Sequence, residues 1–477
     1  MTAAPRATLV GLDFGTTTSS CLVGDAEVRR GAATGRMELA SLVERFRSPL
    51  ERTPIKGDRL DVAAAERLLD RWLAEAAVDP ATLVGGGALL TGLTASRQDA
   101  PRLVAAIRAR LSGALVATAD DPRLESWLAF QGACAATSRR HPEQLFVHVD
   151  VGGGTANLAL GRAGEVLATG CLFVGARHVR LAPGSRRIEA LSPQAAALLA
   201  HLGIDAGVGE ELAESDVARI VAWQVALVDA AITGEPLDAA PVTTLHVQVP
   251  FEPGVPADEL AEAVVTISGG VGELVHAALA GEGLPGLSAF GDLGVDLARA
   301  LVAHPRLGPQ WGRSPVEAGG RATCLGLLRH SVRLSGTSLH LPRPGVLPLA
   351  DLPIVGTFTP ADDDAVLARL LDLARRSPGG AGVRLTRLEP AAAAVRELGE
   401  RIGRALERLA WPPDRALVLL LDADCGKALG ACATRFGAHD LPIVAIDALD
   451  LPDAAFASIG VPVEGAVPVS FHGLRGA

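Results

Sequence analysis

Residues 145–160 read LFVHVDVGGGTANLAL, and residues 8–23 read TLVGLDFGTTTSSCLV. In both stretches an apolar run ends in an aspartate, a glycine turn follows, and threonine leads into a second apolar run. Apolar runs bounded by glycine turns are typical of hairpin strands. We expect third strands at 27–29, after a turn at Gly24-Asp25, and at 166–169. Asp13 and Asp150 stand 137 positions apart, and a pattern repeated at this distance predicts a duplicated α/β domain.

A glycine turn after a strand suits the binding of phosphate. Its backbone N–H groups can surround phosphate oxygens, and an aspartate at the strand end can hold Mg²⁺ through water. Two facing turns would clamp a polyphosphate between two domains, where ligand sites are common. A third segment, 264–273, places Gly269-Gly270 between a strand and a helix, so that the backbone can approach a flat ligand. For any one of these segments, an ordinary glycine turn without a ligand is the competing interpretation. The P-loop pattern GxxxxGK[ST] does not occur in the sequence.

Length and composition exclude several classes of protein. The chain has 477 residues, a net charge of −10 and a pI near 5.6, without a dense Lys/Arg stripe, so we expect no nucleic-acid partner. Six cysteines without a CxxC pair indicate a reducing cytoplasm. No apolar run reaches 18 residues, so no membrane partner is expected. At about 150 residues per domain the length suits three domains, which we place at 1–138, 139–335 and 336–477.

Elsewhere the sequence predicts alternating helices and strands. Helical spacing of apolar residues is found at 62–77, 101–111, 122–138 and 216–232. The five prolines at 342–360 predict a linker or an edge strand. Asp362-Asp363-Asp364 are predicted to cap a helix that reaches residue 374. A smaller α/β domain should then end the chain, with a helix at 389–409, a strand at 416–421 and a helix at 427–436.

The glycine motifs resemble those of the actin, heat-shock-70 and sugar-kinase ATPases. Residues 13–18 are similar to the first phosphate motif of this superfamily, 150–155 to its second, and 268–273 to its adenosine motif. Residues 125–136 resemble its first connecting helix, and 319–326 stand where the second belongs. The resemblance implies an actin-like ATPase fold, in which two ribonuclease-H-like domains surround a nucleotide cleft.

A closer resemblance is to the ethanolamine ammonia-lyase reactivating factors, the EutA family. It extends over nearly the whole chain, and its specific part is Gly426-Lys427-Ala428-Leu429-Gly430 together with 441–447. The resemblance implies an ATP- and Mg²⁺-dependent factor that releases damaged cobalamin from ethanolamine ammonia-lyase, so that intact adenosylcobalamin can enter. It also implies a cytoplasmic protein. Association with a bacterial microcompartment and formation of a homodimer are left open.

The resemblance assigns roles to residues of this chain. Asp13 and Asp150 would flank Mg²⁺, and Glu125 would orient the attacking water. A carboxylate favoured by the helix dipole is an equally good interpretation of Glu125. Lys427 would contact a phosphate or the partner, unless it is a solvated lysine. The predicted nucleotide contacts are Gly15, Thr16, Thr17, Gly152, Gly153, Gly154 and Thr155 for the phosphates, and Gly269, Gly270 and Glu273 for adenosine and ribose.

Three other functions share these motifs. A reactivase subunit for diol or glycerol dehydratase is the nearest alternative. A small-molecule kinase would need a catalytic aspartate between the two phosphate motifs, and Asp99, Asp120 and Asp121 are available. A filament-forming scaffold is the third class. Its membrane-tethered members end in an amphipathic helix, which the segment 463–468 with its glycine and proline cannot form.

Overall fold

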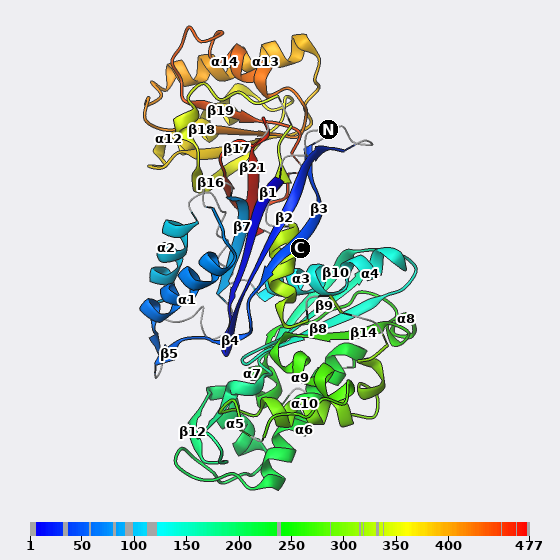
Figure 1. The fold of residues 1–477 in the computed structure, drawn as a ribbon. Coiled ribbons are helices and arrows are strands. Elements are labelled where there is room, and N and C mark those ends of the chain that lie inside the picture. Colours follow the sequence, from blue (N-terminus) through cyan, green and yellow to red (C-terminus); the bar gives the residue numbers. More distant parts are fainter. Residues whose placement is uncertain are drawn as a thin grey trace, which may run out of the picture.

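The protein, seen in a computed structural model, is built on three large β-sheets with helices on their faces (Figure 1). In this view the first sheet lies between the other two, and the predicted mixed α/β class is confirmed. The structure describes residues 6–31, 37–56, 59–79, 83–90, 99–111, 122–235, 240–286, 288–313, 316–317, 319–330, 333–336, 338–449, 451–463 and 465–474.

The first sheet contains the first glycine turn. Its strand order is β3-β2-β1-β7, with β4 (Glu51–Arg52) beside β2, and only β7 runs parallel to β1. The four strands are β1 (Arg6–Phe14), β2 (Thr18–Arg30), β3 (Met37–Arg47) and β7 (Leu83–Leu90). A two-stranded ribbon follows β4, formed by β5 (Ile55–Lys56) and β6 (Arg59–Leu60).

The predicted turn at Gly24-Asp25 is wrong, and residues 27–29 form a strand but not a third one. The strand β2 continues through both, and the third strand is β3. The pairing with β3 shifts register at Val23/Gly24 and again between Asp25 and Glu27. Such irregularities bend a strand without ending it. A glycine next to an aspartate therefore marks a bulge here instead of a hairpin.

The second sheet repeats the first. Its order is β13-β10-β9-β8-β14, the strands β8, β9 and β10 form an antiparallel meander, and β14 runs parallel to β8. Both sheets thus have the third, second, first and fourth strand in that spatial order, which confirms the predicted duplication. The strands are β8 (Phe146–Val151), β9 (Ala156–Arg162), β10 (Glu165–Leu172), β13 (Val247–Val249) and β14 (Val264–Ser268).

Helices cover the outer face of each of these sheets. On the first sheet, Leu69 and Trp72 of α1 (Val62–Glu75) and Leu103 of α2 (Ala100–Arg110) bury the apolar side of β1 and β2. On the second sheet the helices are α5 (Pro193–His201), α6 (Glu214–Thr233), α9 (Gly269–Leu279) and α10 (Gly294–Ala303). The shorter elements there are η3 (Ala176–His178), β11 (Val179–Leu181), β12 (Ile188–Leu191), α7 (Pro241–His246), α8 (Ala257–Ala261) and η4 (Gly308–Gln310).

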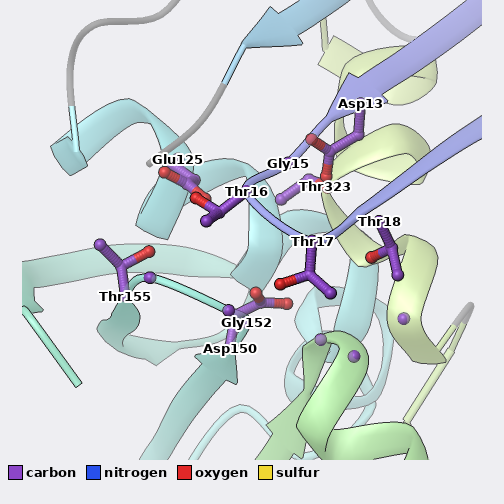
Figure 2. Close-up of a pocket in the computed structure, with 15 residues that line it drawn as sticks. Asp13, Gly15, Thr16, Thr17, Thr18, Glu125, Asp150, Gly152, Thr155 and Thr323 are labelled. Atoms are coloured by element: carbon purple, nitrogen blue, oxygen red, sulfur yellow. Dashed lines mark hydrogen bonds between the residues drawn. The ribbon is translucent and has the colours of Figure 1, made fainter. Parts of the chain in front are cut away.

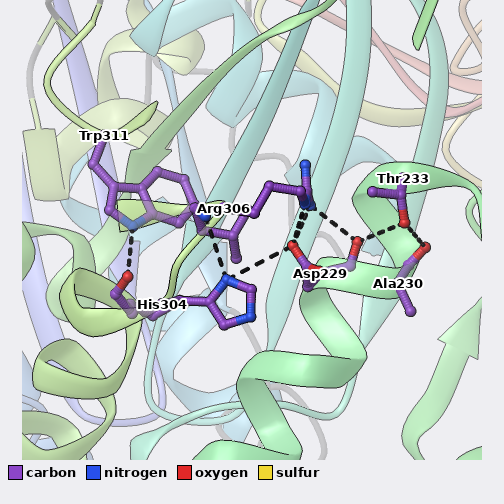
Figure 3. Close-up of polar contacts among 8 residues, drawn as sticks. Asp229, Ala230, Thr233, His304, Arg306 and Trp311 are labelled. Atoms are coloured by element: carbon purple, nitrogen blue, oxygen red, sulfur yellow. Dashed lines mark hydrogen bonds and ion pairs between the residues drawn. The ribbon is translucent and has the colours of Figure 1, made fainter. Parts of the chain in front are cut away.

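An ion pair fixes the segment after α10 against α6. The Arg306 guanidinium donates to the carboxylate of Asp229 with an Nε–Oδ1 distance of 2.6 Å, and His304 lies 3.9 Å from the same carboxylate (Figure 3). The indole of Trp311 donates to the Leu301 carbonyl at 3.1 Å. These contacts fix the segment 304–311 against α6 and α10.

Two helices lie between the first and second sheets and contact each other. Phe130 of α3 (Pro122–Ala133) packs on the second sheet, and Leu328 of α11 (Ala322–His330) packs on the first. They cross at glycines: a Cβ on Gly132 would lie 1.8 Å from the Ala322 carbonyl oxygen. The helix predicted at 122–138 ends at Ala133, and α4 (Ala135–Arg140) follows it. The short η5 (Gly319–Arg321) precedes α11.

The C-terminal region forms the third sheet, in the order β15-β21-β20-β16-β17-β18-β19. The strands β16 to β19 are parallel and carry three helices on one face. The ranges are β15 (Arg333–Leu334), β16 (Leu349–Phe358), α12 (Asp364–Arg376), β17 (Ala381–Leu385), α13 (Ala392–Arg408), β18 (Leu417–Leu421), α14 (Gly426–Ala433), β19 (Ile443–Ile446), β20 (Ala454–Ile459) and β21 (Pro468–Leu474), with η6 (Pro344–Val346) before β16.

The prediction of a linker or an edge strand at 342–360 is wrong, and the predicted helix cap at 362–364 is confirmed. The strand β16 lies between β20 and β17, so it is an interior strand and not a linker or an edge. The register of its pairing with β20 shifts between Leu349 and Leu352, and Pro353 is paired with Phe456. Asp363 caps α12 as predicted, because its carboxylate accepts from the Val366 N–H at 2.9 Å.

The first sheet also contacts the C-terminal region. Ala7 and Val28, at the end of the sheet remote from the glycine turn, pack with Leu334 and Ala466. The strand β1 therefore runs from this contact to Asp13. Within the described residues, no helix combines the length and apolar composition that crossing a bilayer requires.

Candidate functional site

The two glycine turns meet in one pocket between the first and second sheets (Figure 2). Residues of β1, β8, α3, α9 and α11 surround it. The part of the pocket that water can enter has a volume of about 40 Å³. Its lining residues are Asp13, Gly15, Thr16, Thr17, Thr18, Glu125, Asp150, Gly152, Gly153, Gly154, Thr155, Gly269, Gly270, Gly320 and Thr323.

The two turns have the same internal hydrogen bond. The Gly15 N–H donates to the Thr18 carbonyl at 3.0 Å, and the Gly152 N–H donates to the Thr155 carbonyl at 3.0 Å. Each turn follows an aspartate at the end of the first strand of its sheet. The duplication seen in strand order therefore extends to the backbone of the turns.

The carbonyl groups of the second turn are all anchored on its outer side. The N–H groups of Ala176 and Arg177 donate to the carbonyls of Gly152 and Gly153 at 3.2 and 2.6 Å. His178 Nε2 lies 2.8 Å from the Gly154 carbonyl oxygen and donates to it. A trans peptide points its C=O and the next N–H in opposite directions. The N–H groups that follow these three carbonyls are therefore directed toward the pocket, as an anion site requires.

Thr53 anchors the first turn in a similar way. Its hydroxyl donates to the Gly15 carbonyl at 2.7 Å, and its N–H donates to the Thr17 carbonyl at 2.9 Å. The Ser19 hydroxyl lies 2.8 Å from that of Thr53. No motif in the sequence points to Thr53, because only the folded chain brings the segment after β4 beside the turn.

Three helices begin at the pocket. Glu125 lies in the first turn of α3, Gly269 and Gly270 begin α9, and Thr323 is the second residue of α11. The N-terminus of a helix carries a partial positive charge and free N–H groups. Three such ends around one space favour an anion such as a phosphate chain.

The two aspartates have different surroundings. Asp13 accepts a hydrogen bond from the Thr323 hydroxyl at 2.7 Å. Asp150 accepts one from the Ser268 hydroxyl. Burial raises the pKa of the Asp150 carboxyl to about 6, although the bond from Ser268 acts in the opposite direction. Both carboxylates face the pocket in Figure 2, and each keeps a defined orientation through a hydroxyl donor.

The pocket has the chemistry for magnesium and a polyphosphate. The Thr17 Oγ1 atom is buried there without a hydrogen-bond partner within the described part of the chain. A buried hydroxyl of this kind requires a partner, and a bound phosphate would supply one. Two carboxylates on opposite sheets offer the oxygen ligands that Mg²⁺ takes. The residues therefore fit Mg²⁺ and a phosphate chain.

Most predicted site residues are brought together, and Glu273 is the exception. All the others line the pocket, whereas Glu273 in α9 accepts a hydrogen bond from the Gly320 N–H. Thr18, Gly320 and Thr323 also line the pocket, although they are not among the predicted nucleotide contacts. The signal for Gly320 and Thr323 was their place in 319–326, the segment that stands where the second connecting helix belongs. Whether these residues bind a nucleotide stays a prediction.

Other candidates lie elsewhere. Asp99, the kinase candidate, is buried in an ion pair with Arg59 at 2.9 Å and does not line the pocket. Asp120 and Asp121 fall outside the described residues. Lys427 is exposed at the start of α14 in the C-terminal region. All six cysteines are free thiols.

Two sheets of one topology, with facing glycine turns and two connecting helices between them, define the actin-like fold class. The chain belongs to the EutA family, because the family model described as "Ethanolamine utilisation protein EutA" matches residues 6–475. It is 30% identical over 480 residues to "Ethanolamine ammonia-lyase reactivase EutA" of Salmonella typhimurium, and 30% identical over 482 residues to the protein of that name in Escherichia coli K12. Each alignment covers 98% of this chain and 97% of the relative.

Solved structures give looser matches. A Ppx/GppA family member from Aquifex aeolicus is 12% identical, with a TM-score of 0.32 and coverage of 60% of this chain and 73% of that one. MreB 5 of Spiroplasma citri bound to AMPPNP is 15% identical, with a TM-score of 0.28 and coverage of 62% and 96%. Likenesses this loose carry no functional assignment.

Proposed function

We propose that this protein is an ATP- and Mg²⁺-dependent reactivating factor for ethanolamine ammonia-lyase. It would release damaged cobalamin from the lyase so that intact adenosylcobalamin can bind. The observation that carries the proposal is the full-length similarity to two ethanolamine ammonia-lyase reactivases, at 30% identity. The paired glycine turns and the unpartnered Thr17 hydroxyl support a polyphosphate as the ligand of the pocket.

The residues of the pocket have separable tasks in this proposal. The N–H groups of the second turn, whose carbonyls are anchored by 176–178, hold phosphate oxygens. The hydroxyls of Thr16 and Thr17 add donors from the first turn. Asp13 and Asp150 hold Mg²⁺, which when bound neutralises charge on the phosphoryl oxygens. Glu125 orients the attacking water from the first turn of α3.

The close contact between the two turns at Thr17 and Gly153 provides the link to a conformational change. In this proposal the turns move apart when a nucleotide binds, and hydrolysis followed by release lets them close. The first sheet carries this motion along β1 to Ala7, which packs on the C-terminal region. We infer that the C-terminal region presents a client-binding surface whose orientation depends on the nucleotide. The free cysteines suit a cytoplasmic protein.

The test is a reactivation assay. Ethanolamine ammonia-lyase inactivated with cyanocobalamin is mixed with this protein, ATP, Mg²⁺ and adenosylcobalamin, and deamination is followed. Recovery that requires ATP and is lost in Asp150→Ala supports the proposal. Failure of the lyase to recover while the protein hydrolyses ATP contradicts the choice of client. The same assay with diol dehydratase, and ATP turnover with candidate kinase substrates, then tests the alternatives.

A further inference from the structure

A chain of buried hydrogen bonds leads from the interior of the second sheet to Asp150. His148 lies on β8 and is completely buried, two positions before Asp150. Its Nδ1 atom is 2.9 Å from the Thr266 hydroxyl, and its Nε2 atom is 2.8 Å from the Ser268 hydroxyl. Ser268 in turn bonds the Asp150 carboxylate. Thr266 and Ser268 face His148 and Asp150 because β14 runs parallel to β8 in that register.

Each hydrogen bond between Thr266 and Asp150 can be given a donor and an acceptor in one consistent way. An ionised carboxylate only accepts, so the Ser268 hydroxyl donates to Asp150. The Ser268 oxygen then accepts from His148 Nε2–H. A neutral imidazole has a single N–H, so Nδ1 is an acceptor and the Thr266 hydroxyl donates to it. The ring is completely buried between two hydroxyl groups, and burial of this kind favours the neutral form that this arrangement needs.

We propose that Thr266, His148 and Ser268 are positioning residues that act in series on Asp150. Thr266 fixes the tautomer of His148, and the ring N–H directs the Ser268 hydroxyl away from the ring. Ser268 thereby holds the Asp150 carboxylate in one orientation toward the pocket. Without the Thr266 hydroxyl the ring can take the other tautomer, and Ser268 would then donate to His148 instead of Asp150. The donor–acceptor direction of these hydrogen bonds is independent of the proposed function. Their effect on Mg²⁺ binding rests on that function.

The first experiment measures the tautomer directly. In ¹⁵N-histidine-labelled protein, the ring nitrogen shifts of His148, assigned by their absence in His148→Gln, should report a neutral ring protonated at Nε2. Thr266→Val should move the population toward the Nδ1–H form. Thr434→Val is the matched control, since that buried hydroxyl bonds the Gly430 carbonyl of its own helix at 2.9 Å and should leave His148 unchanged. A charged ring, or an Nδ1–H ring in the wild type, would overturn the proposal.

The second experiment measures the consequence for the pocket. Mg²⁺ is titrated calorimetrically into protein saturated with ATP. Ser268→Ala should weaken apparent Mg²⁺ affinity by about 10- to 100-fold, the range for removing a partner of a metal ligand, with ATP affinity in the absence of Mg²⁺ retained. Thr266→Val should give a smaller loss in the same direction, and His148→Gln, which keeps an N–H donor, should come close to the wild type.

Equal Mg²⁺ affinity in the wild type, Ser268→Ala and Thr266→Val would contradict the positioning role. An equal loss of ATP affinity without Mg²⁺ would also contradict it, since that is the result of general damage to the fold. If Ser268→Ala does not fold, the isosteric Thr266→Val provides the same comparison. Failure of the wild type to bind Mg²⁺ and ATP would refute the proposed function. The tautomer measurement would still decide the donor–acceptor direction of the hydrogen bonds.

Discussion

Thr17 and Gly153 meet across the pocket: a Cβ atom on Gly153 would lie 1.9 Å from Thr17 Oγ1 and 3.0 Å from Thr17 Cβ. The two turns are therefore in contact where a phosphate chain is proposed to bind. Only a glycine at this position lets them approach so closely. A substitution at Gly153 therefore tests how closely the two turns approach each other.

We expect Gly153→Ala to hold the two turns apart. Because the added methyl group overlaps Thr17, amide hydrogens of residues 13–18 should exchange faster in the variant than in the wild type. Hydrogen-exchange mass spectrometry measures this. Gly152→Ala is the matched control, since its Cβ would meet only the Thr155 carbonyl oxygen, at 3.9 Å. Equal exchange in the two variants would contradict the contact.

Removal of either pocket carboxylate should abolish ATP turnover and preserve the fold. We expect Asp13→Ala and Asp150→Ala to lower the turnover rate by about 100- to 1000-fold, the range for losing one electrostatic contact with a transition state. Thermal unfolding should show no increase in Tm on addition of Mg²⁺ and ATP, in contrast to the wild type. Turnover retained in both variants would exclude the assignment of these carboxylates.

The crossing of α3 and α11 should tolerate no side chain at Gly132. A methyl group there would overlap the Ala322 carbonyl, so Gly132→Ala should cost about 1–3 kcal/mol of the free energy of unfolding. The loss is expected although alanine is the better helix former by about 1 kcal/mol. Urea unfolding measures it, with Gly283→Ala as control, because no atom lies within 4 Å of a Cβ at that position. A neutral Gly132→Ala would show that the helices can move apart freely.

Asp447 should make stability depend on pH. It is completely buried, its Oδ2 accepts from the Gly426 N–H at 3.0 Å, and its Oδ1 has no partner among the described residues. Burial, together with the nearby Asp424 carboxylate, raises the pKa of Asp447 from 3.8 to about 6. The folded state therefore binds the proton more tightly, so this contribution is fully present below about pH 4 and is lost as the pH rises through 6.

The measurement is the free energy of unfolding in urea at pH 4.5 and 7. Carboxyls whose pKa is lowered, such as Asp61, give the opposite slope, so the informative quantity is the difference between the wild type and Asp447→Asn. The variant should gain stability relative to the wild type as the pH rises from 4.5 to 7. A difference that does not change with pH would contradict the raised pKa of the buried Asp447 carboxyl.

The sequence by itself determined the local elements of the site. An apolar strand that ends in aspartate and glycine can be recognised because strand formation and turn formation depend on neighbouring residues. Both phosphate-type turns, the strand before Gly269 and the cap at Asp363 follow from this. The same local reasoning failed at Gly24-Asp25, where pairing with β3 keeps β2 continuous, and at 342–360, where burial between β20 and β17 outweighs the prolines.

Only the tertiary structure decided which groups complete the site. Thr53, His178, Thr323 and Ser268 reach the turns from distant parts of the chain, and no spacing in the sequence encodes those contacts. The packing of α9 on η5 likewise turned Glu273 toward Gly320 instead of the pocket. Strand and turn signals act over a few residues, whereas the partner of a buried polar group is chosen by the packing of whole sheets and helices. The chemistry of each turn is thus local, and its orientation is a property of the assembled fold.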